Sequence, residues 1–115
     1  VIGCVIEVHR VLGPGLLESA YEQALCHELS LQGIEFRKQV DLPVVYKGHV
    51  LPHYYRLDVV VEEALLLELK AVEILLPLHK AQTLTYLRMS GLKTALLINF
   101  NVKHLKDGIK RFVMG

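Results

Sequence analysis

The sequence contains few of the residues that build disulfide-rich domains. There are two cysteines among the 115 residues, Cys4 and Cys26, and they form no Cys-x-x-Cys pair. Two cysteines are too few for a disulfide scaffold. We therefore expect both to be buried thiols of a protein that stays in a reducing compartment, the cytoplasm.

Long hydrophobic runs are also absent, although 52% of the residues are hydrophobic. The unbroken apolar runs are far shorter than the roughly 20 residues that a membrane-spanning helix needs. We therefore expect no membrane segment, and no signal peptide is visible. Val1 stands inside an apolar pattern, so we expect the natural chain to begin upstream of it. Residues 1–115 are expected to form one domain.

An excess of charge of one sign is missing as well. The formal net charge is +1, there is no strong basic stripe, and little length remains for an arm that could hold a duplex. The sequence also has no Walker loop, no GxGxxG, no HExxH and no Ser-His-Asp spacing. These absences exclude the enzyme classes that such motifs mark, while a local basic patch remains compatible with the composition.

What is present is a clear alternation of helical and strand patterns. Apolar spacing predicts helices, and alternation predicts strands that are separated by glycine and proline. Lys47-Gly48 is predicted to be a two-residue turn, and Pro52 to interrupt the strand that follows it. The predicted helices cover 1–12, 16–32, 77–90 and the last segment from 103 to 112. The predicted strands cover 36–46, 49–51, 56–62, 64–70 and a short buried strand at 95–98.

The most informative stretch is the strongly apolar hairpin formed by residues 56–62 and 64–70. Side chains alternate between the two faces of a strand, so Leu57, Val59 and Val61 are expected to share one face. A two-residue turn at 62–63 would place Asp58 opposite a leucine. A three-residue loop at 62–64 places it opposite Glu68 and pairs apolar residues with apolar ones. We favour the three-residue loop, because a slip of one residue turns every side chain to the other face.

This register predicts a compact charged site within an apolar sheet. Asp58 and Glu68 would lie side by side, with Lys70 on the same face of the strand as Glu68. Two carboxylates in one partly buried site cannot both ionise without compensation, which a divalent cation bound by oxygen ligands would provide. The alternative is a surface ion pair between Glu68 and Lys70, with Asp58 solvated.

Other residues are candidates for the same site. Glu18 stands in the first turn of a predicted helix and aligns with Leu25 and Leu29, which predicts that it faces inward, although an acid here also stabilises a helix start. Gln82 and Tyr86 are four residues apart and share one helix face, so they are expected either to reach over the carboxylates or to form a mixed polar edge.

Histidine and lysine side chains receive simpler interpretations. We interpret His9 as structural, and His49 and His53 as exposed residues and not as metal ligands. The last segment carries three lysines on one side, which we interpret as the solvated face of a packed terminal helix, with a phosphate contact as the alternative. These lysines are Lys103, Lys106 and Lys110.

The order of these elements and acids resembles the PD-(D/E)XK nuclease superfamily. More closely, the chain resembles the family named GxxExxY, whose signature reads Gly15-Leu16-Leu17-Glu18-Ser19-Ala20-Tyr21. The segment Gln82-Thr83-Leu84-Thr85-Tyr86 is similar to the QxxxY motif of the RecB-like branch. Further matches are Tyr55-Arg56-Leu57-Asp58, Glu68-Leu69-Lys70-Ala71-Val72-Glu73 and Leu97-Ile98-Asn99-Phe100. One departure is that Leu57, and not proline, precedes Asp58.

The resemblance implies both a fold and a site. The fold would be a mixed α/β fold with a restriction-endonuclease-like α-β-β-β-α-β core, in which helices flank a central mixed sheet. Asp58 and Glu68 would bind Mg²⁺ or Mn²⁺, with Glu18 completing or supporting the metal site and the Leu69 carbonyl as a further ligand. Lys70 would orient or deprotonate the attacking water.

The remaining residues of the implied site act around Lys70. Gln82 would position Lys70 or the substrate phosphate, and Tyr86 would lie behind it. A metal bound by carboxylates activates water and neutralises the charge that develops on a phosphodiester, so these groups suit one reaction.

Three functions compete on this basis. The first is a metal-dependent nuclease that hydrolyses DNA or RNA, with DNA favoured, acting as a homodimer or with a partner protein. The second is a nucleic-acid-binding or protein-binding module that keeps the nuclease fold but is non-catalytic or depends on a partner. The third is purely structural, with the acids forming an ion-pair network around Lys70. We place the third last, because unpaired buried carboxylates are costly without a cation.

Overall fold

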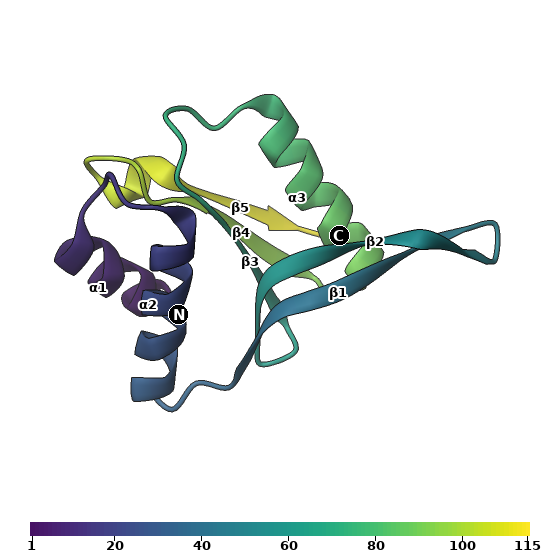
Figure 1. Ribbon diagram of the computed structural model, residues 1–115, viewed down its shortest axis with the longest axis horizontal. Helices are drawn as coiled ribbons and strands as arrows, with labels where there is room; N and C mark the ends of the chain where they lie inside the picture. Colours follow the sequence, from purple (N-terminus) through teal and green to yellow (C-terminus); the bar gives the residue numbers. More distant parts are fainter.

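Five strands form one mixed sheet, and helices cover both of its faces (Figure 1). The computed structural model covers residues 1–115. The strand order is β1-β2-β3-β4-β5, in which β3 and β4 are parallel and the other neighbours are antiparallel. The elements are α1 (Ile2–Leu12), α2 (Glu18–Leu31), β1 (Phe36–Tyr46), β2 (His49–Val61), β3 (Leu65–Lys70), α3 (Pro77–Ser90), β4 (Thr94–Asn99), a 3₁₀ helix η1 (Leu105–Gly108) and β5 (Ile109–Val113). The predicted α-β-β-β-α-β core is therefore confirmed, with α1 and β5 added at its two ends.

The parallel pair β3–β4 determines where α3 lies. Two parallel strands need a crossover connection, and α3 provides it. The predicted bounds of this helix are confirmed, because Pro77 begins it and Gly91 ends it with a φ of 78°. None of the three α-helices combines the length and the hydropathy that a membrane-spanning helix needs.

The sheet separates two clusters of buried apolar side chains. The larger cluster packs α1 and α2 against one face, and Tyr21 of α2 stacks on Phe100 with ring centroids 4.6 Å apart. The smaller cluster packs α3 against the other face. Both cysteines are free and buried, as expected. The structural interpretation of His9 is also confirmed, since its Nε2 lies 2.7 Å from the carbonyl oxygen of Val102.

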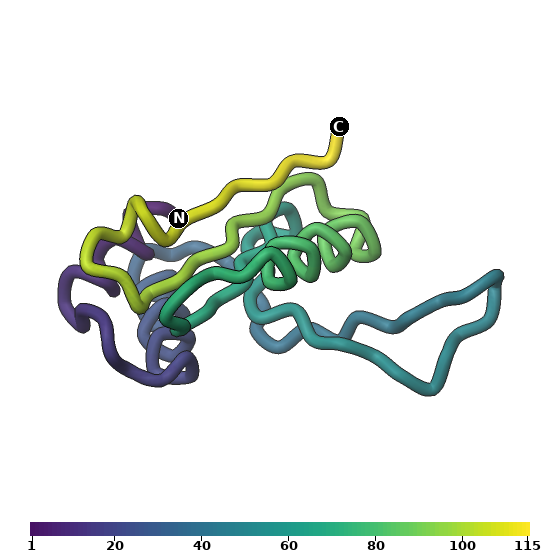
Figure 2. The backbone as a smooth tube through the Cα atoms, turned by 90° about the horizontal axis from the view of Figure 1, so that it is seen from above, coloured from purple at the N-terminus to yellow at the C-terminus, as the bar shows by residue number.

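The hairpin of β1 and β2 projects from the rest of the protein as an arm (Figures 1 and 2). Its tip is the predicted turn, in which Lys47 and Gly48 both have positive φ values, 49° and 77°. The predicted interruption at Pro52 is confirmed for the pairing but not for the strand. β2 continues through Pro52, but residues 51–53 have no partner in β1, because the register shifts between the pairs Pro43–Tyr54 and Val45–Val50, where a residue without an N–H is tolerated. Residues 36–61 thus provide the length for a projecting arm, while the expectation that the chain has no arm for a duplex stays a prediction.

The prediction of a helix in the last segment of the chain is wrong. Residues 105–108 form a 3₁₀ turn and residues 109–113 form β5, an edge strand that pairs with β4. Gly108 lies so close to the Asn99 carbonyl that a side chain there would collide with it, which allows the chain to turn tightly beside β4. The exposed lysines Lys103, Lys106 and Lys110 therefore do not line one helix face.

Candidate active site

Asp58 and Glu68 meet where β2 and β3 separate. The three-residue loop at 62–64 and the opposition of Val60 and Leu66 are confirmed. The strand pairing ends one pair before Asp58 and Glu68. Beyond that last pair, the two side-chain carboxylates accept the backbone N–H groups that strand carbonyls would otherwise accept. The Asp58 N–H donates to Glu68 Oε1 over 3.1 Å, and the Leu69 N–H donates to Asp58 Oδ2 over 2.8 Å. Each carboxylate is thus held by the opposite strand.

A distortion in both β1 and β2 aims Asp58 toward its partner. The β1–β2 pairing skips Gln39 and Asp58, and Gln39 has a φ of 53°. Such local irregularities redirect side chains. Leu57 packs in the cluster beneath α3, whereas Val59 and Val61 pack beneath α1 and α2. The expectation that these three residues share one face is therefore wrong for Leu57, because the alternation breaks at Asp58.

Burial raises the pKa of both carboxyl groups of the pair. Glu68 is only 4% exposed. Burial, followed by the negative charge of Asp58, raises the pKa of Glu68 to about 8. Burial also raises the pKa of Asp58, although the Leu69 N–H and the charge of Lys70 oppose the change. Since a cation favours the deprotonated form of its ligands, this pair is able to release its proton when a metal binds.

Lys70 is half-buried at the end of β3 and forms none of the ion pairs in the structure. The alternative of a surface pair between Glu68 and Lys70 is therefore wrong, because Glu68 is buried and unpaired. The ion-pair network around Lys70 is likewise absent. The charge of the ammonium group still lowers the pKa of Asp58, Glu68 and Glu18. Because the group forms no ion pair, its N–H donors are available to a ligand.

Asn99 holds the chain that follows Lys70. Its Nδ2 donates to the Val72 carbonyl over 2.8 Å, and its Oδ1 accepts the Val72 N–H over 3.0 Å. The Phe100 N–H also donates to the Lys70 carbonyl over 2.9 Å. This positioning role was not predicted. The signal in the sequence is an asparagine directly after the apolar run 95–98 of β4, and the structure shows that this amide is buried.

The loop before α2 places Glu18 at the same end of the sheet. Tyr21 donates its hydroxyl to the Gly13 carbonyl over 2.6 Å and accepts the Leu16 N–H over 3.1 Å. Gly15 has a φ of 100°, and its N–H donates to Asn101 Oδ1 over 3.0 Å. The first and last residues of the segment 15–21 therefore fix the entry into α2, directly before Glu18.

Glu18 itself is exposed, so the expectation that it faces inward is wrong. The residues with which it aligns, Leu25 and Leu29, are buried, but Glu18 is the first residue of α2 and lies beyond the edge of that packing. Partial burial of its carboxyl group raises its pKa, Lys70 lowers it, and the charge of Asp58 raises it further. Glu18 therefore lies within electrostatic reach of the central pair.

A further acid, Glu22, was not predicted. It accepts a hydrogen bond from Gln39 Nε2 over 2.7 Å, and its charge raises the pKa of both Glu18 and Asp58. Its signal in the sequence was its spacing, because it stands four residues after Glu18 on the same helix face.

Gln82 and Tyr86 lie on α3. Gln82 Nε2 donates to the Tyr86 hydroxyl over 3.1 Å. Tyr86 is buried in the cluster beneath α3 together with Leu57, the residue before Asp58. Burial raises the pKa of Tyr86, and the charge of Glu68 adds to the increase. Gln82 forms no hydrogen bond with Lys70.

The acids match a metal site only in part. The structure contains no group of three or more histidine, cysteine, aspartate or glutamate side chains placed to hold a metal ion. Asp58 and Glu68 alone form a two-carboxylate pair, in which Asp58 Oδ2 and Glu68 Oε1 each accept one backbone N–H. This donor set suits Mg²⁺, which is commonly held by one or two carboxylates and keeps several waters.

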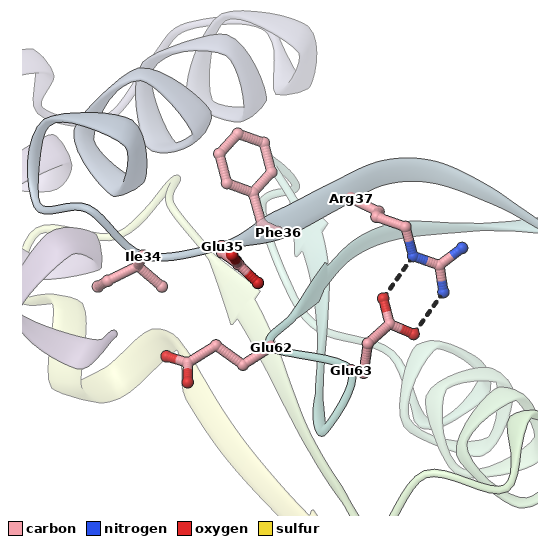
Figure 3. A pocket seen from close by; sticks show the side chains of 6 residues that line it. All are labelled: Ile34, Glu35, Phe36, Arg37, Glu62 and Glu63. Carbon is pink, nitrogen blue, oxygen red and sulfur yellow. Dashed lines mark hydrogen bonds and ion pairs between the residues drawn. The ribbon is translucent and has the colours of Figure 1, made fainter.

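A separate pocket at the β2–β3 loop contains none of these residues. It has a volume of about 470 Å³ and is lined by residues 34–37 together with Glu62 and Glu63. Arg37 forms two hydrogen bonds with Glu63, of 2.6 and 2.8 Å, while Glu62 extends away from that pair (Figure 3). The Arg37–Glu63 pair is exposed, so it stabilises the loop only weakly.

Comparison with known proteins identifies one family. A family model described as the PD-(D/E)XK nuclease superfamily matches residues 1–112. No curated protein and no solved structure gives a significant match.

Proposed function

Because the chain belongs to the PD-(D/E)XK nuclease superfamily, which suggests a nuclease, we propose that it hydrolyses phosphodiester bonds of nucleic acids in a metal-dependent reaction. The observation that carries this proposal is the pair of the half-buried Asp58 and the buried Glu68, which lie side by side where β2 and β3 separate. Ionising both carboxyl groups is costly without a cation, because burial and their mutual repulsion oppose the second charge, and a bound metal would remove that cost.

The proposed roles follow from the position of each residue. Asp58 and Glu68 would hold Mg²⁺ or Mn²⁺, with Glu18 supporting the site from the start of α2 and the Leu69 carbonyl as a further ligand. The bound metal would acidify water and neutralise charge on the phosphate. Lys70, which has no ion-pair partner, would orient or deprotonate the attacking water and stabilise the charge that develops on the phosphate oxygens.

Gln82 and Tyr86 would act from α3, which packs on the face of the sheet opposite to α2 and Glu18. Since Gln82 donates to the Tyr86 hydroxyl, its amide carbonyl is free to accept a hydrogen bond. We propose that Gln82 contacts the substrate or Lys70 when substrate is bound, with Tyr86 fixing the amide. Within the superfamily we propose membership of the GxxExxY family, on the segment 15–21, and of the RecB-like branch, on Gln82 and Tyr86.

The substrate and the assembly are further proposals. We propose DNA before RNA as the substrate, and a homodimer or a complex with a partner protein as the acting form. One observation favours a partner-dependent or non-catalytic binding module as the alternative. Glu18 is exposed and does not complete a three-residue ligand group with Asp58 and Glu68. Such a site could be completed when another chain or the nucleic acid itself binds.

The test is cleavage of single-stranded and double-stranded DNA and RNA with Mg²⁺ or Mn²⁺, with and without EDTA. Asp58→Ala and Lys70→Ala are compared with the wild type. Glu62→Gln is the matched control, because Glu62 is an exposed acid at the end of the same strand pair. We expect cleavage that EDTA and both site variants abolish and that the control retains. If the wild type binds metal but cuts none of the substrates, the binding module replaces the nuclease.

A further inference from the structure

A second cavity lies next to the proposed catalytic residues. It has a volume of about 310 Å³ and opens between α3 and the base of the β1–β2 arm. Figure 1 shows α3 ending beside the point where these two strands leave the sheet. The residues that matter here are Tyr55 from β2 and Gln82, Tyr86 and Met89 from α3.

Tyr86 connects this cavity with the acids. It lines the cavity and is also buried in the apolar cluster that contains Leu57, Val60 and Leu66. Leu57 directly precedes Asp58, and Leu66 lies two residues before Glu68 on the same face of β3. A group held in the cavity would therefore contact Tyr86, which is close enough to the carboxylate pair for the charge of Glu68 to raise its pKa.

The chemistry of the lining selects a flat, uncharged group. None of the residues that line the cavity carries a charge, so the lining offers no cation to bind a phosphate. Tyr55 is 51% exposed, and its ring centroid lies 5.7 Å from that of Tyr86, with the planes tilted by 37°. Part of Tyr55 is therefore accessible to a group that stacks on it. Gln82 adds an amide oxygen that is not used in its bond to Tyr86.

We propose that this cavity binds one unpaired nucleobase of the substrate, stacked on Tyr55 and hydrogen-bonded through its edge to Gln82. The inference rests on the function proposed above, because it assumes that the phosphate chain passes the carboxylate pair. A base within a duplex has no free face, so it must be unpaired or turned out of the helix to enter. The protein therefore selects single-stranded, frayed or mismatched nucleic acid.

The test compares two neighbouring tyrosines of β2. Tyr55→Leu removes the stacking surface. Tyr54→Leu is the matched control, since Tyr54 is similarly exposed, at 58% against 51%, but does not line the cavity. Affinity for a fluorescent single-stranded oligonucleotide is measured by anisotropy with Ca²⁺ or EDTA. We expect Tyr55→Leu to weaken binding about tenfold or more, as removal of a base-stacking aromatic does. We expect Tyr54→Leu to retain the wild-type affinity.

The outcomes separate this inference from the proposed function. Binding that depends on Tyr55 without cleavage of any substrate would support the cavity and refute the nuclease. Cleavage that Tyr55→Leu and Tyr54→Leu leave unchanged, on single strands and duplexes alike, would refute the cavity and support the nuclease. Equal losses of affinity in both variants would assign binding to the whole arm and overturn the inference. Circular dichroism confirms that each variant is folded.

Discussion

Replacing Glu68 by glutamine tests whether the carboxylate pair is protonated in the folded protein. Glu68 is almost fully buried, and burial together with Asp58 raises its pKa from the ordinary value of 4.5 to about 8. Glutamine has nearly the same shape and can still accept the Asp58 N–H through its amide oxygen. The variant therefore removes the titration while keeping the local structure.

The sign and the size of the effect follow from the two pKa values. Below pH 4.5 the group is protonated in both the folded and the unfolded protein, so it does not make stability depend on pH. Between 4.5 and 8 the folded state keeps a proton that the unfolded state has lost. The free energy of unfolding of the wild type therefore falls as pH rises. The full loss is on the order of 5 kcal/mol, at about 1.4 kcal/mol for each unit of pKa difference.

The assay is urea unfolding of the wild type and of Glu68→Gln, followed by circular dichroism in EDTA, from about pH 5 to about pH 8. The stability of each protein also depends on its other ionisable groups. The informative quantity is therefore the difference between the two proteins at each pH. We expect the variant to gain on the wild type by about 3 kcal/mol across this range. A difference that stays constant would show that Glu68 does not titrate here, and the reasoning about the pair would be wrong.

Three further predictions concern neighbouring residues. At about pH 8, excess Mg²⁺ should raise the melting temperature of the wild type but not of Glu68→Gln, because only the wild type has both carboxylates; equal shifts would contradict the two-carboxylate site. Asn99→Leu should lower the free energy of unfolding in urea by about 3 kcal/mol, because it leaves the backbone of Val72 without its partners; an unchanged midpoint would remove its positioning role. Arg37→Gln should cost less than about 1 kcal/mol in the same measurement, because its ion pair is exposed; a larger loss would mean that the loop depends on it.

Local signals determined the parts of the fold that could be predicted. The helix 77–90 has a proline at its start and a glycine at its end, so its bounds depend on adjacent residues alone. The opposition of Asp58 and Glu68 was also predictable, because only one hairpin register keeps apolar residues together. For the same reason, two of the candidate acids could be placed side by side from the sequence.

The features that were missed depend on contacts between distant segments. Residues 109–113 form a strand because β4 offers a free edge, which the local spacing of apolar residues does not reveal. Leu57 faces α3 because the pairing is distorted at Gln39, in a different strand. The nearness of Glu22 to the site likewise depends on how α2 packs beside β1.

The two outer strands of the sheet limit how copies of the chain can associate. An unpaired strand edge can recruit a second chain and extend the sheet, unless charges or proline oppose it. The β1 edge carries Arg37, Lys38 and Pro43, and the β5 edge carries Lys110 and Arg111, all exposed. Cationic side chains on both edges disfavour the joining of two sheets into one. We therefore expect the homodimer proposed above to form through a surface other than these two edges.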